Sequence, residues 1–263
     1  MKKKRIAQLN YLLKIFGYKG SSILGVCIDS RKVKEGDLFF ALKGERSDGH
    51  DFLKEIFLKK AAGAVVSKGY KGESFGLPLI YVEDVTVFLQ YLAARILREK
   101  PPLVIGVTGS VGKTTTKEFI AHILEGNFKV AKTPGNANSQ VGLPVCIING
   151  EGDEEVLVAE MGMNHFGELK NLVQMCPPDI AVITKIGLSH VEFFPRGKED
   201  VARAKAEIFS HPKTALCILN SEVKDYEAIK EVKGNTTGLK NYKRTRPSLK
   251  SINLMNLNLR QEI

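Results

Sequence analysis

The chain has 263 residues and a formal net charge of +10 at pH 7, a length that suits one or two ordinary domains. The excess charge lies at the two ends, in residues 2–5 and after residue 232, so the stretch between them is nearly neutral. A nucleic-acid-binding protein usually carries its basic residues as a stripe on the folded body. We therefore expect no nucleic-acid partner.

Membrane spans and metal clusters are also disfavoured. No apolar run approaches the roughly 20 residues that cross a bilayer. Residues 6–17 are interrupted by Gln8, Asn10 and Lys14, so they predict an amphipathic helix rather than a signal peptide. The four cysteines are far apart and form no CxxC pair, which argues against a metal site built on them. A cytoplasmic protein without membrane insertion is expected.

The first hundred residues mix short strands and helices. Apolar runs typical of strands occupy residues 23–30, 36–44, 62–67 and 77–82, whereas helical spacing occupies residues 50–63 and 85–100. Pro101 and Pro102 end the last of these helices. We place a domain boundary there and expect a small α/β domain over residues 1–100.

Residues 103–124 then combine a buried-strand pattern, a glycine-rich turn and an amphipathic helix. Gly109 and Gly112 let backbone N–H groups turn toward an anion at the helix N-terminus, where the helix dipole also favours negative charge. Lys113 can add a positive charge at the outer phosphates, and the Thr114 hydroxyl can ligate Mg²⁺. This order of elements predicts a nucleotide triphosphate site.

The turn departs from the strict P-loop spacing in one respect. The first glycine of that motif would stand at Val107, whereas Gly106 comes one residue early. A purely structural turn is the alternative, but the flanking strand and helix favour phosphate binding. The candidate nucleotide-binding residues of this turn are Gly109, Ser110, Val111, Gly112, Lys113, Thr114 and Thr115.

The rest of the second part alternates apolar runs with helix-compatible segments. The runs at residues 143–148, 156–162, 180–187 and 215–220 predict strands of a doubly wound parallel sheet. We assign residues 101–221 to this domain. Residues 222–263 are basic and weakly periodic, and we expect a poorly ordered tail there.

Ligands bind beyond the carboxyl ends of such strands, so polar residues at these ends are site candidates. Glu160 follows one apolar run and suits a hard cation, although a capping acid is the alternative. His190 follows another run and could be a ligand, an orienting residue or a structural histidine. Lys205 lies in a helical pattern and, on spacing alone, reads as a surface lysine.

Two polar segments carry weaker signals. After a Pro-Gly turn, Asn136 and Asn138 offer amide groups that could hold phosphate, sugar or nothing. Residues 29–52 could bind an anion such as a diphosphate, because arginine offers a fork suited to phosphate oxygens. An ordinary polar rim explains that segment equally well. Its candidate residues are Ser30, Arg31, Lys43, Arg46, Asp48 and His50.

These segments together resemble the Mur ligases, the ATP-dependent amide ligases of peptidoglycan precursor synthesis. Residues 160–169 and 187–194 are most similar to the member that joins D-alanyl-D-alanine to UDP-N-acetylmuramoyl-tripeptide. The segments that carry the resemblance are residues 29–52, 107–118, 133–144, 160–169, 183–194 and 204–209.

The resemblance implies a role for each candidate. The first domain would hold the UDP part of the tripeptide substrate, and residues 109–115 would hold ATP, with D-alanyl-D-alanine as the second substrate. Thr114 and Glu160 would hold one Mg²⁺, and His190 with a carbamylated Lys205 would hold a second. Asn136, Asn138 and Asn164 would line the nucleotide and substrate cleft, with Asn164 on the nucleotide side. The implied catalytic residues are Lys113, His190 and Lys205.

Two departures from the family bear on activity. Ala206 follows Lys205 where the family usually has Gly, which is a mild difference. More seriously, the resemblance fades after Asn220, where the family continues into a third domain, as if the reading frame were truncated or shifted. We therefore expect little turnover by this chain alone. A monomer is also expected. The alternatives are a folylpolyglutamate synthetase-like ligase or a non-catalytic nucleotide-binding remnant.

Overall fold

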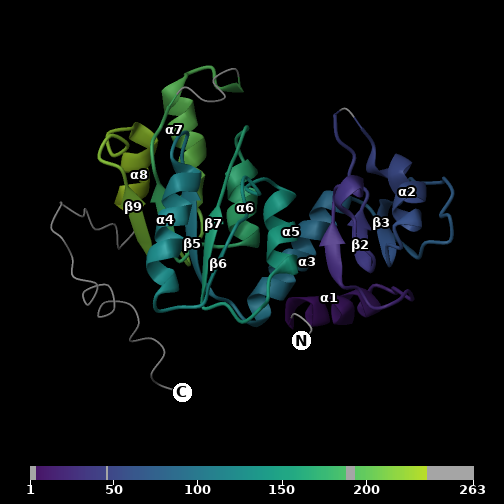
Figure 1. Ribbon diagram of the computed structural model, residues 1–263. Helices are drawn as coiled ribbons and strands as arrows, with labels where there is room; N and C mark the ends of the chain where they lie inside the picture. Colours follow the sequence, from purple (N-terminus) through teal and green to yellow (C-terminus); the bar gives the residue numbers. More distant parts are fainter. Residues whose placement is uncertain (1–3, 46, 188–192, 236–263) are drawn as a thin grey trace.

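The computed structural model describes residues 4–45, 47–187 and 193–235. These residues form an α/β protein with two parallel sheets (Figure 1). The first sheet has the strand order β1-β2-β3-β4, and the second has the order β6-β7-β5-β8-β9. The fold is therefore the expected one, a small α/β domain followed by a parallel-sheet domain that contains the glycine-rich turn.

The N-terminal part contains one sheet and its helices. Its helices are α1 (Lys4–Ile15), α2 (Leu53–Leu58) and α3 (Val85–Glu99), with short 3-10 helices at Ser30–Lys32 and Gly49–Phe52. Its strands are β1 (Gly25–Cys27), β2 (Asp37–Phe40), β3 (Gly63–Ser67) and β4 (Leu79–Val82). The four strands, α2 and α3 lie inside segments for which the sequence pattern predicted that structure, whereas α1 begins two residues before the predicted helix and the two 3-10 helices were not predicted.

The second part is built around β5 (Leu103–Thr108), which pairs with β7 on one side and with β8 on the other. The remaining strands are β6 (Val130–Lys132), β7 (Val156–Glu160), β8 (Ile180–Ile183) and β9 (Leu216–Leu219). The helices are α4 (Lys113–Glu125), α5 (Gly142–Asn149), α6 (Glu168–Met175), α7 (Lys198–Ala206) and α8 (Glu227–Asn235), with a 3-10 helix at Glu207–Phe209.

One sequence prediction in this part is wrong. The apolar run at residues 143–148 was expected to be a strand, but it forms helix α5. Leu143, Ile147 and Ile148 lie on its buried side, at the i, i+4 and i+5 positions of a helix. Because both faces of this short run are largely apolar, its periodicity does not separate a buried helix from a buried strand.

The helices cover the second sheet on both faces. Helix α4 packs on one face, where Ala121 contacts a cluster that includes Ile105, Val107 and Val158. On the other face, the core continues into α1, α3 and the first sheet, so that one cluster of buried residues spans both parts of the chain. Helix α1 packs against α3 and α5 at this junction (Figure 1). The two sheets are therefore joined by a shared core.

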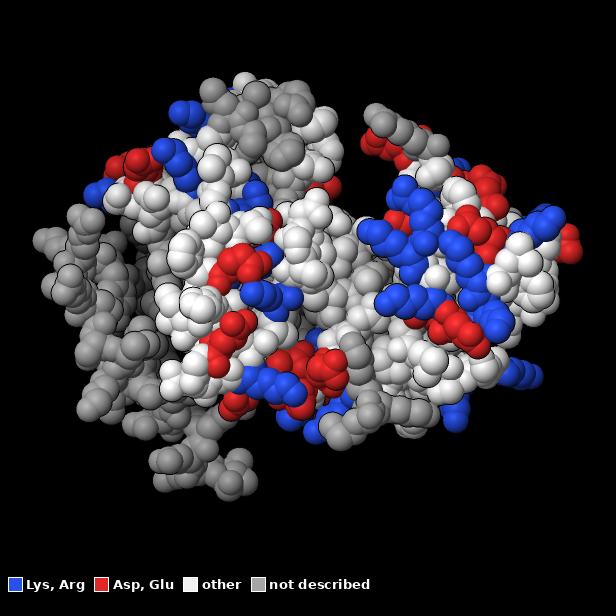
Figure 2. Space-filling model, viewed as in Figure 1, with Lys and Arg blue, Asp and Glu red and all other residues white. Residues whose placement is uncertain are grey.

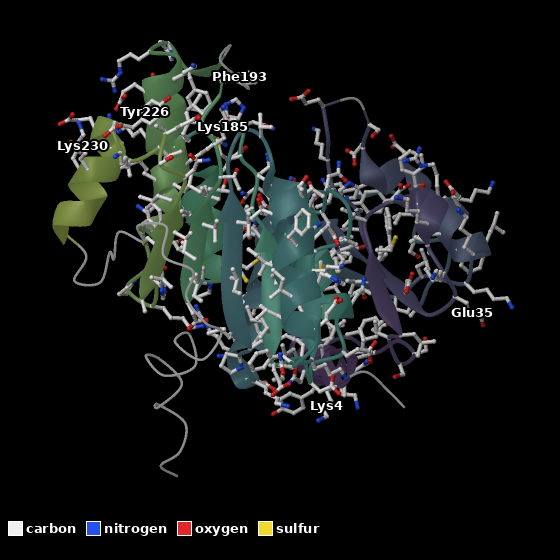
Figure 3. All side chains as sticks on the ribbon, turned by 60° about the vertical axis from the view of Figure 1, so that its left-hand side comes forward. Lys4, Glu35, Lys185, Phe193, Tyr226 and Lys230 are labelled. Atoms are coloured by element: carbon white, nitrogen blue, oxygen red, sulfur yellow. The ribbon has the colours of Figure 1, made fainter. Side chains whose placement is uncertain are left out.

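The predicted tail begins later than the sequence indicated. Residues 227–235 form α8, which packs against α7 (Figure 3 labels Tyr226 and Lys230 on this side). Val223 and Ile229 are each 1% exposed and belong to the core. The sequence pattern did not reveal these two buried residues, because apolar residues are few and widely spaced in this segment. The remaining residues of the predicted tail, 236–263, lie outside the described residues. Within the described part of the chain, no helix is long and apolar enough to cross a membrane.

Candidate functional site

Strand β5 ends beside two other strand ends, and the glycine-rich turn leaves from that point. Val107 pairs with Glu160 of β7, and Thr108 pairs with Ile183 of β8. Gly109 follows with φ 151°, and a Cβ atom there would lie 1.9 Å from the Thr184 hydroxyl oxygen. The close approach of β8 and the positive φ therefore both require glycine at this position.

The turn is fastened to the end of β8 and leads directly into α4. The Ser110 amide donates to the Lys185 carbonyl at 2.6 Å, and the Thr184 hydroxyl donates to the Val111 carbonyl at 2.7 Å. Gly112 forms the N-cap of α4 with φ 85°, without a capping side chain. The N–H groups of the first helical turn have no intrahelical partners, so this end of α4 is suited to an anion.

Lys113 lies at the start of α4 and folds back over the turn. Its ammonium donates to the Gly109 carbonyl at 2.8 Å. Lys113 and Gly109 also line a pocket of about 300 Å³ beyond the strand ends. A cation and a helix N-terminus therefore face the same space, the arrangement that binds the outer phosphates of a nucleotide.

Glu160, at the end of β7, is 1% exposed and is held by groups from α4 and from the segment between β6 and α5. The Thr114 hydroxyl donates to Glu160 Oε2 at 2.8 Å, and Asn138 Nδ2 donates to Glu160 Oε1 at 2.8 Å. The Glu160 amide donates to the Thr133 hydroxyl at 2.9 Å. The carboxylate and the hydroxyl of Thr114 thus present adjacent oxygen atoms at the helix N-terminus, a donor set that Mg²⁺ prefers.

Lys205 is almost fully buried in α7, at 2% exposure, rather than on the surface as its spacing suggested. It lines the same pocket as Lys113. Burial away from water, together with the smaller effect of the positive charge of Lys113, lowers the pKa of Lys205 to about 7. A large fraction of this amine is therefore uncharged near neutral pH.

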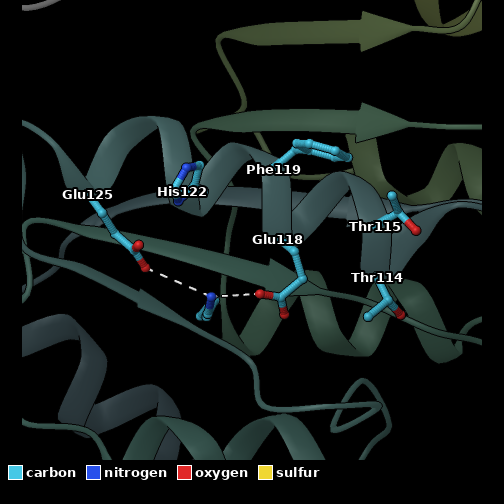
Figure 4. A pocket seen from close by; sticks show the side chains of 7 residues that line it. Thr114, Thr115, Glu118, Phe119, His122 and Glu125 are labelled. Atoms are coloured by element: carbon cyan, nitrogen blue, oxygen red, sulfur yellow. Dashed lines mark hydrogen bonds and ion pairs between the residues drawn. The ribbon is translucent and has the colours of Figure 1, made fainter.

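Some of the predicted residues line this pocket, and others do not. Asn138 and Asn164 contribute to its wall, whereas Asn136 is exposed and lies outside the wall. Thr114 and Thr115 line a neighbouring hollow on the outer side of α4 (Figure 4). His190 lies outside the described residues, and the structure does not place it relative to Lys205.

The predicted anion-binding residues of the N-terminal part that the structure describes contact neighbouring groups of the same domain. Ser30 is buried and donates to Glu55 at 3.1 Å, and the Arg31 guanidinium, 84% exposed, pairs with Asp29. Asp48 accepts from the His50 amide and lies 2.5 Å from His50 Nδ1. These contacts fix the loops but leave Arg31 accessible.

Basic side chains gather on this part of the molecule. Figure 2 shows Lys and Arg over the N-terminal domain with acidic residues between them. Lys43 is exposed and forms a backbone bridge with Asp48. Arg46 lies outside the described residues.

Sequence reasoning missed several residues that build the pocket. Gly162 allows the close approach of Asn138, because a Cβ there would lie 2.9 Å from Asn138 Cγ. Glu168 accepts from the Asn164 amide at 2.6 Å and so holds the segment before α6. Gln140 donates to the Glu168 carbonyl at 2.7 Å and accepts from Gln90 of α3, which ties the pocket to the N-terminal part. Only the fold brings these partners together.

Family comparisons agree with this geometry. The Mur ligase middle domain matches residues 107–258, which is more than half of the chain, and the domain described as Mur ligase family, catalytic domain, matches residues 22–96. The middle-domain match extends past residue 221, where we expected the domain to end.

Two curated relatives that are similar to this chain have the same name. The UDP-N-acetylmuramoyl-tripeptide--D-alanyl-D-alanine ligase of Bacillus subtilis is 40% identical over 193 residues, which cover 73% of this chain and 42% of the relative. The ligase of the same name from Escherichia coli is 36% identical over 202 residues, which cover 76% and 44%. The chain thus spans less than half the length of these relatives.

Solved structures show the same relationship. A crystal structure of MurF from Acinetobacter baumannii has a TM-score of 0.72 at 29% identity and covers 86% of this chain and 51% of its own. MurF from Thermotoga maritima, in complex with ADP, has a TM-score of 0.68 at 34% identity and covers 78% and 48%. With the middle-domain match, these findings establish that the chain belongs to the Mur ligase family.

Proposed function

We propose that this chain carries the UDP-substrate-binding and ATP-binding parts of a ligase that joins D-alanyl-D-alanine to UDP-N-acetylmuramoyl-tripeptide. Support comes from the name that its 36–40% identical relatives share. The observation that carries the proposal is the meeting of Lys113, Glu160 and Lys205 around the N-terminus of α4.

The chemistry that suits this arrangement is phosphoryl transfer followed by amide formation. The tripeptide carboxylate would attack the γ-phosphorus of ATP, which forms an acyl phosphate and releases ADP. The amine of D-alanyl-D-alanine would then attack the acyl carbon, lose a proton and displace phosphate. Lys113 and the free N–H groups at the start of α4 would stabilise the negative charge on the transferring phosphoryl oxygens.

A magnesium ion fits beside Glu160. Its carboxylate is buried, and the Thr114 hydroxyl is hydrogen-bonded to it at 2.8 Å. Hard oxygen atoms of this kind, next to a phosphate-binding helix end, are the ligands that Mg²⁺ uses with nucleotides. Thr114 and Glu160 would hold the ion, which when bound would offset the charge of the phosphates.

Lys205 fits the carbamylation that the family resemblance implies. An uncharged amine can add to the carbon of CO₂, forming an N–C bond and releasing a proton, so that a cation becomes an anion. The lowered pKa of Lys205, to about 7, supplies the uncharged amine, and Lys113 offers a positive neighbour for the product. We propose that the carbamate and His190 hold a second Mg²⁺.

Isothermal titration of the 263-residue chain tests the proposal. We expect heat with UDP-N-acetylmuramoyl-tripeptide and with ATP in the presence of Mg²⁺, and none with folate. Binding of folate in place of the UDP-linked tripeptide would favour a folylpolyglutamate synthetase-like ligase instead. Absence of heat with both proposed ligands would reject the function.

We further propose a cytoplasmic monomer. A reaction that consumes ATP supports the compartment, since ATP is supplied inside the cell. Sedimentation equilibrium of the purified chain measures the oligomeric state, and a mass near 29.0 kDa is the expected result.

A further inference from the structure

Lys117 is a fully buried lysine in the phosphate-binding helix. It lies in α4, one turn beyond Lys113, and its side chain is 0% exposed. Lysine is almost never buried to this extent unless its charge is paired. The proposed chemistry gives this residue no role, so its burial requires a separate explanation.

The hydrogen bonds of the Lys117 ammonium group reach two carbonyls outside its own helix. It donates to the Thr133 carbonyl at 2.7 Å and to the Gly135 carbonyl at 3.0 Å. Glu118 Oε1 lies 3.2 Å away, and Glu160 Oε2 lies 3.7 Å away. Three N–H groups are available on an ammonium, and these contacts use all of them.

These contacts converge on Glu160 from two directions. Thr133, whose carbonyl is held by Lys117, also accepts the Glu160 amide on its hydroxyl at 2.9 Å. Gly135 leads to Asn138, which donates to Glu160 Oε1 at 2.8 Å. The positive charge of Lys117 also lies near Glu160 Oε2, the oxygen that accepts from Thr114. One buried cation thus organises both the backbone and the carboxylate of the site.

We propose that Lys117 is a positioning residue for the nucleotide-metal site. It acts through Glu160 and the segment 133–138 and does not touch the nucleotide. Its charge lies 3.7 Å from Glu160 Oε2, and its hydrogen bonds hold the segment that supplies Asn138. The inference rests on the proposed function, since it concerns the binding of a nucleoside triphosphate together with a divalent cation.

The test separates metal-dependent from metal-independent binding. ATP affinity of the full chain is measured by titration calorimetry, once with Mg²⁺ and once with EDTA. The ratio of the two affinities is the gain in ATP affinity that the metal provides. Removal of residues that orient metal ligands costs about 10–100-fold in metal affinity, so Lys117→Met should lower this gain by that factor. ATP affinity in EDTA should change by no more than about twofold, because Lys113 and the turn are untouched.

Lys132→Met is the matched control. Lys132, the last residue of β6, lines the hollow beside α4 and pairs with Glu118 at 2.6 Å and with Glu125 at 3.8 Å, the ion pairs that the dashed lines in Figure 4 mark. It shares the Glu118 partner with Lys117, but it is half-buried and its ion pairs are with Glu118 and Glu125 rather than with Glu160. Its metal-dependent gain should equal that of the wild type.

A second readout needs no nucleotide. Hydrogen exchange of the Glu160 amide in the ligand-free chain should be faster in Lys117→Met than in Lys132→Met. If Lys117→Met does not fold, Lys117→Gln replaces it, because the glutamine amide keeps two N–H donors and removes the charge. If a folded Lys117 variant gains as much ATP affinity from Mg²⁺ as the wild type does, the inference is overturned. An unchanged exchange rate of the Glu160 amide in that variant also overturns it. A wild-type chain that binds no ATP at all overturns the proposed function instead.

Discussion

Thr114 and Glu160 are joined by a hydrogen bond of 2.8 Å, although 46 positions separate them in the sequence. Strand register explains the contact, since Glu160 pairs with Val107 at the point where β5 turns toward α4. The pairing of β5 with β7 therefore brings the hydroxyl at the helix start next to the carboxylate at the neighbouring strand end. This geometry concentrates anion-binding and cation-binding groups at one edge of the sheet.

Replacement of Lys113 should weaken nucleotide binding with little effect on folding. In Lys113→Met, the loss of one charge-assisted contact should lower ATP affinity by roughly 10–100-fold. The loss for AMP should be smaller, because the ammonium faces the outer phosphates. Titration calorimetry measures both affinities. Lys68→Met, an exposed lysine of the N-terminal part, is the control and should bind both nucleotides like the wild type.

Gly109 should tolerate no side chain. In Gly109→Ala, the new Cβ would lie 1.9 Å from the Thr184 hydroxyl oxygen at φ 151°. Strain of this kind costs of order 1–3 kcal/mol, and displacement of the turn should also abolish ATP binding. Chemical denaturation and titration measure the two effects. Gly69→Ala is the control, because no atom lies within 4 Å of its added Cβ, and wild-type stability in Gly109→Ala would contradict the prediction.

Arg5 and Glu154 form a buried ion pair, with each side chain 3% exposed. Arg5 also donates to the Ile147 carbonyl at 2.7 Å. Arg5→Met leaves the Glu154 charge buried without its partner, so the free energy of unfolding should fall by about 3–5 kcal/mol. The double variant Arg5→Met/Glu154→Met should recover much of this loss.

An exposed pair nearby provides the comparison for Arg5. Lys129 and Asp153 lie 2.6 Å apart, with side chains 52% and 30% exposed. Lys129→Met should change the free energy of unfolding by no more than about 1 kcal/mol. Urea denaturation measures all of these variants. Equal losses in Arg5→Met and Lys129→Met would show that burial of the Arg5 pair has no special effect.

Stability should depend on pH through Lys205. Its pKa is about 7 in the folded chain, against an ordinary value of 10.5 for a lysine in water. Between these values the unfolded chain binds more protons at this position, so the free energy of unfolding rises with pH across that window. Thermal unfolding in CO₂-free buffer at pH 7 and pH 9.5 measures the effect. The wild type should gain stability relative to Lys205→Met, and parallel curves would contradict this prediction.

Much of the fold could be predicted because its strands are short apolar runs bounded by turns. Residues 103–108 and 156–160 are examples, and both are buried on two faces. Strand β6, with only Val130, Ala131 and Lys132, carries too little pattern to be recognised. Helix α5 was mistaken for a strand because a short, uniformly apolar run lacks a decisive period.

Residues of the candidate site could be predicted where the sequence next to them indicated their position. Glu160 ends an apolar run, and Lys113 follows a glycine-rich turn. Lys117 gave no such signal, because a lysine in a helix usually reaches solvent, and only the fold places residues 133–135 over it. Burial of Lys205 was hidden for the same reason. Contacts between distant segments decide such cases, and a local pattern does not contain them.

The apolar cluster that runs from the first sheet through α1 and α3 into the second sheet makes the two halves energetically inseparable. Asn149 adds to this junction by hydrogen-bonding both the amide and the carbonyl of Val26, the middle residue of edge strand β1. Division of the chain after residue 100 would expose apolar surface on both fragments, so neither fragment should fold on its own. Melting should then be a single cooperative event, in which a ligand held by one half also protects the other from proteases.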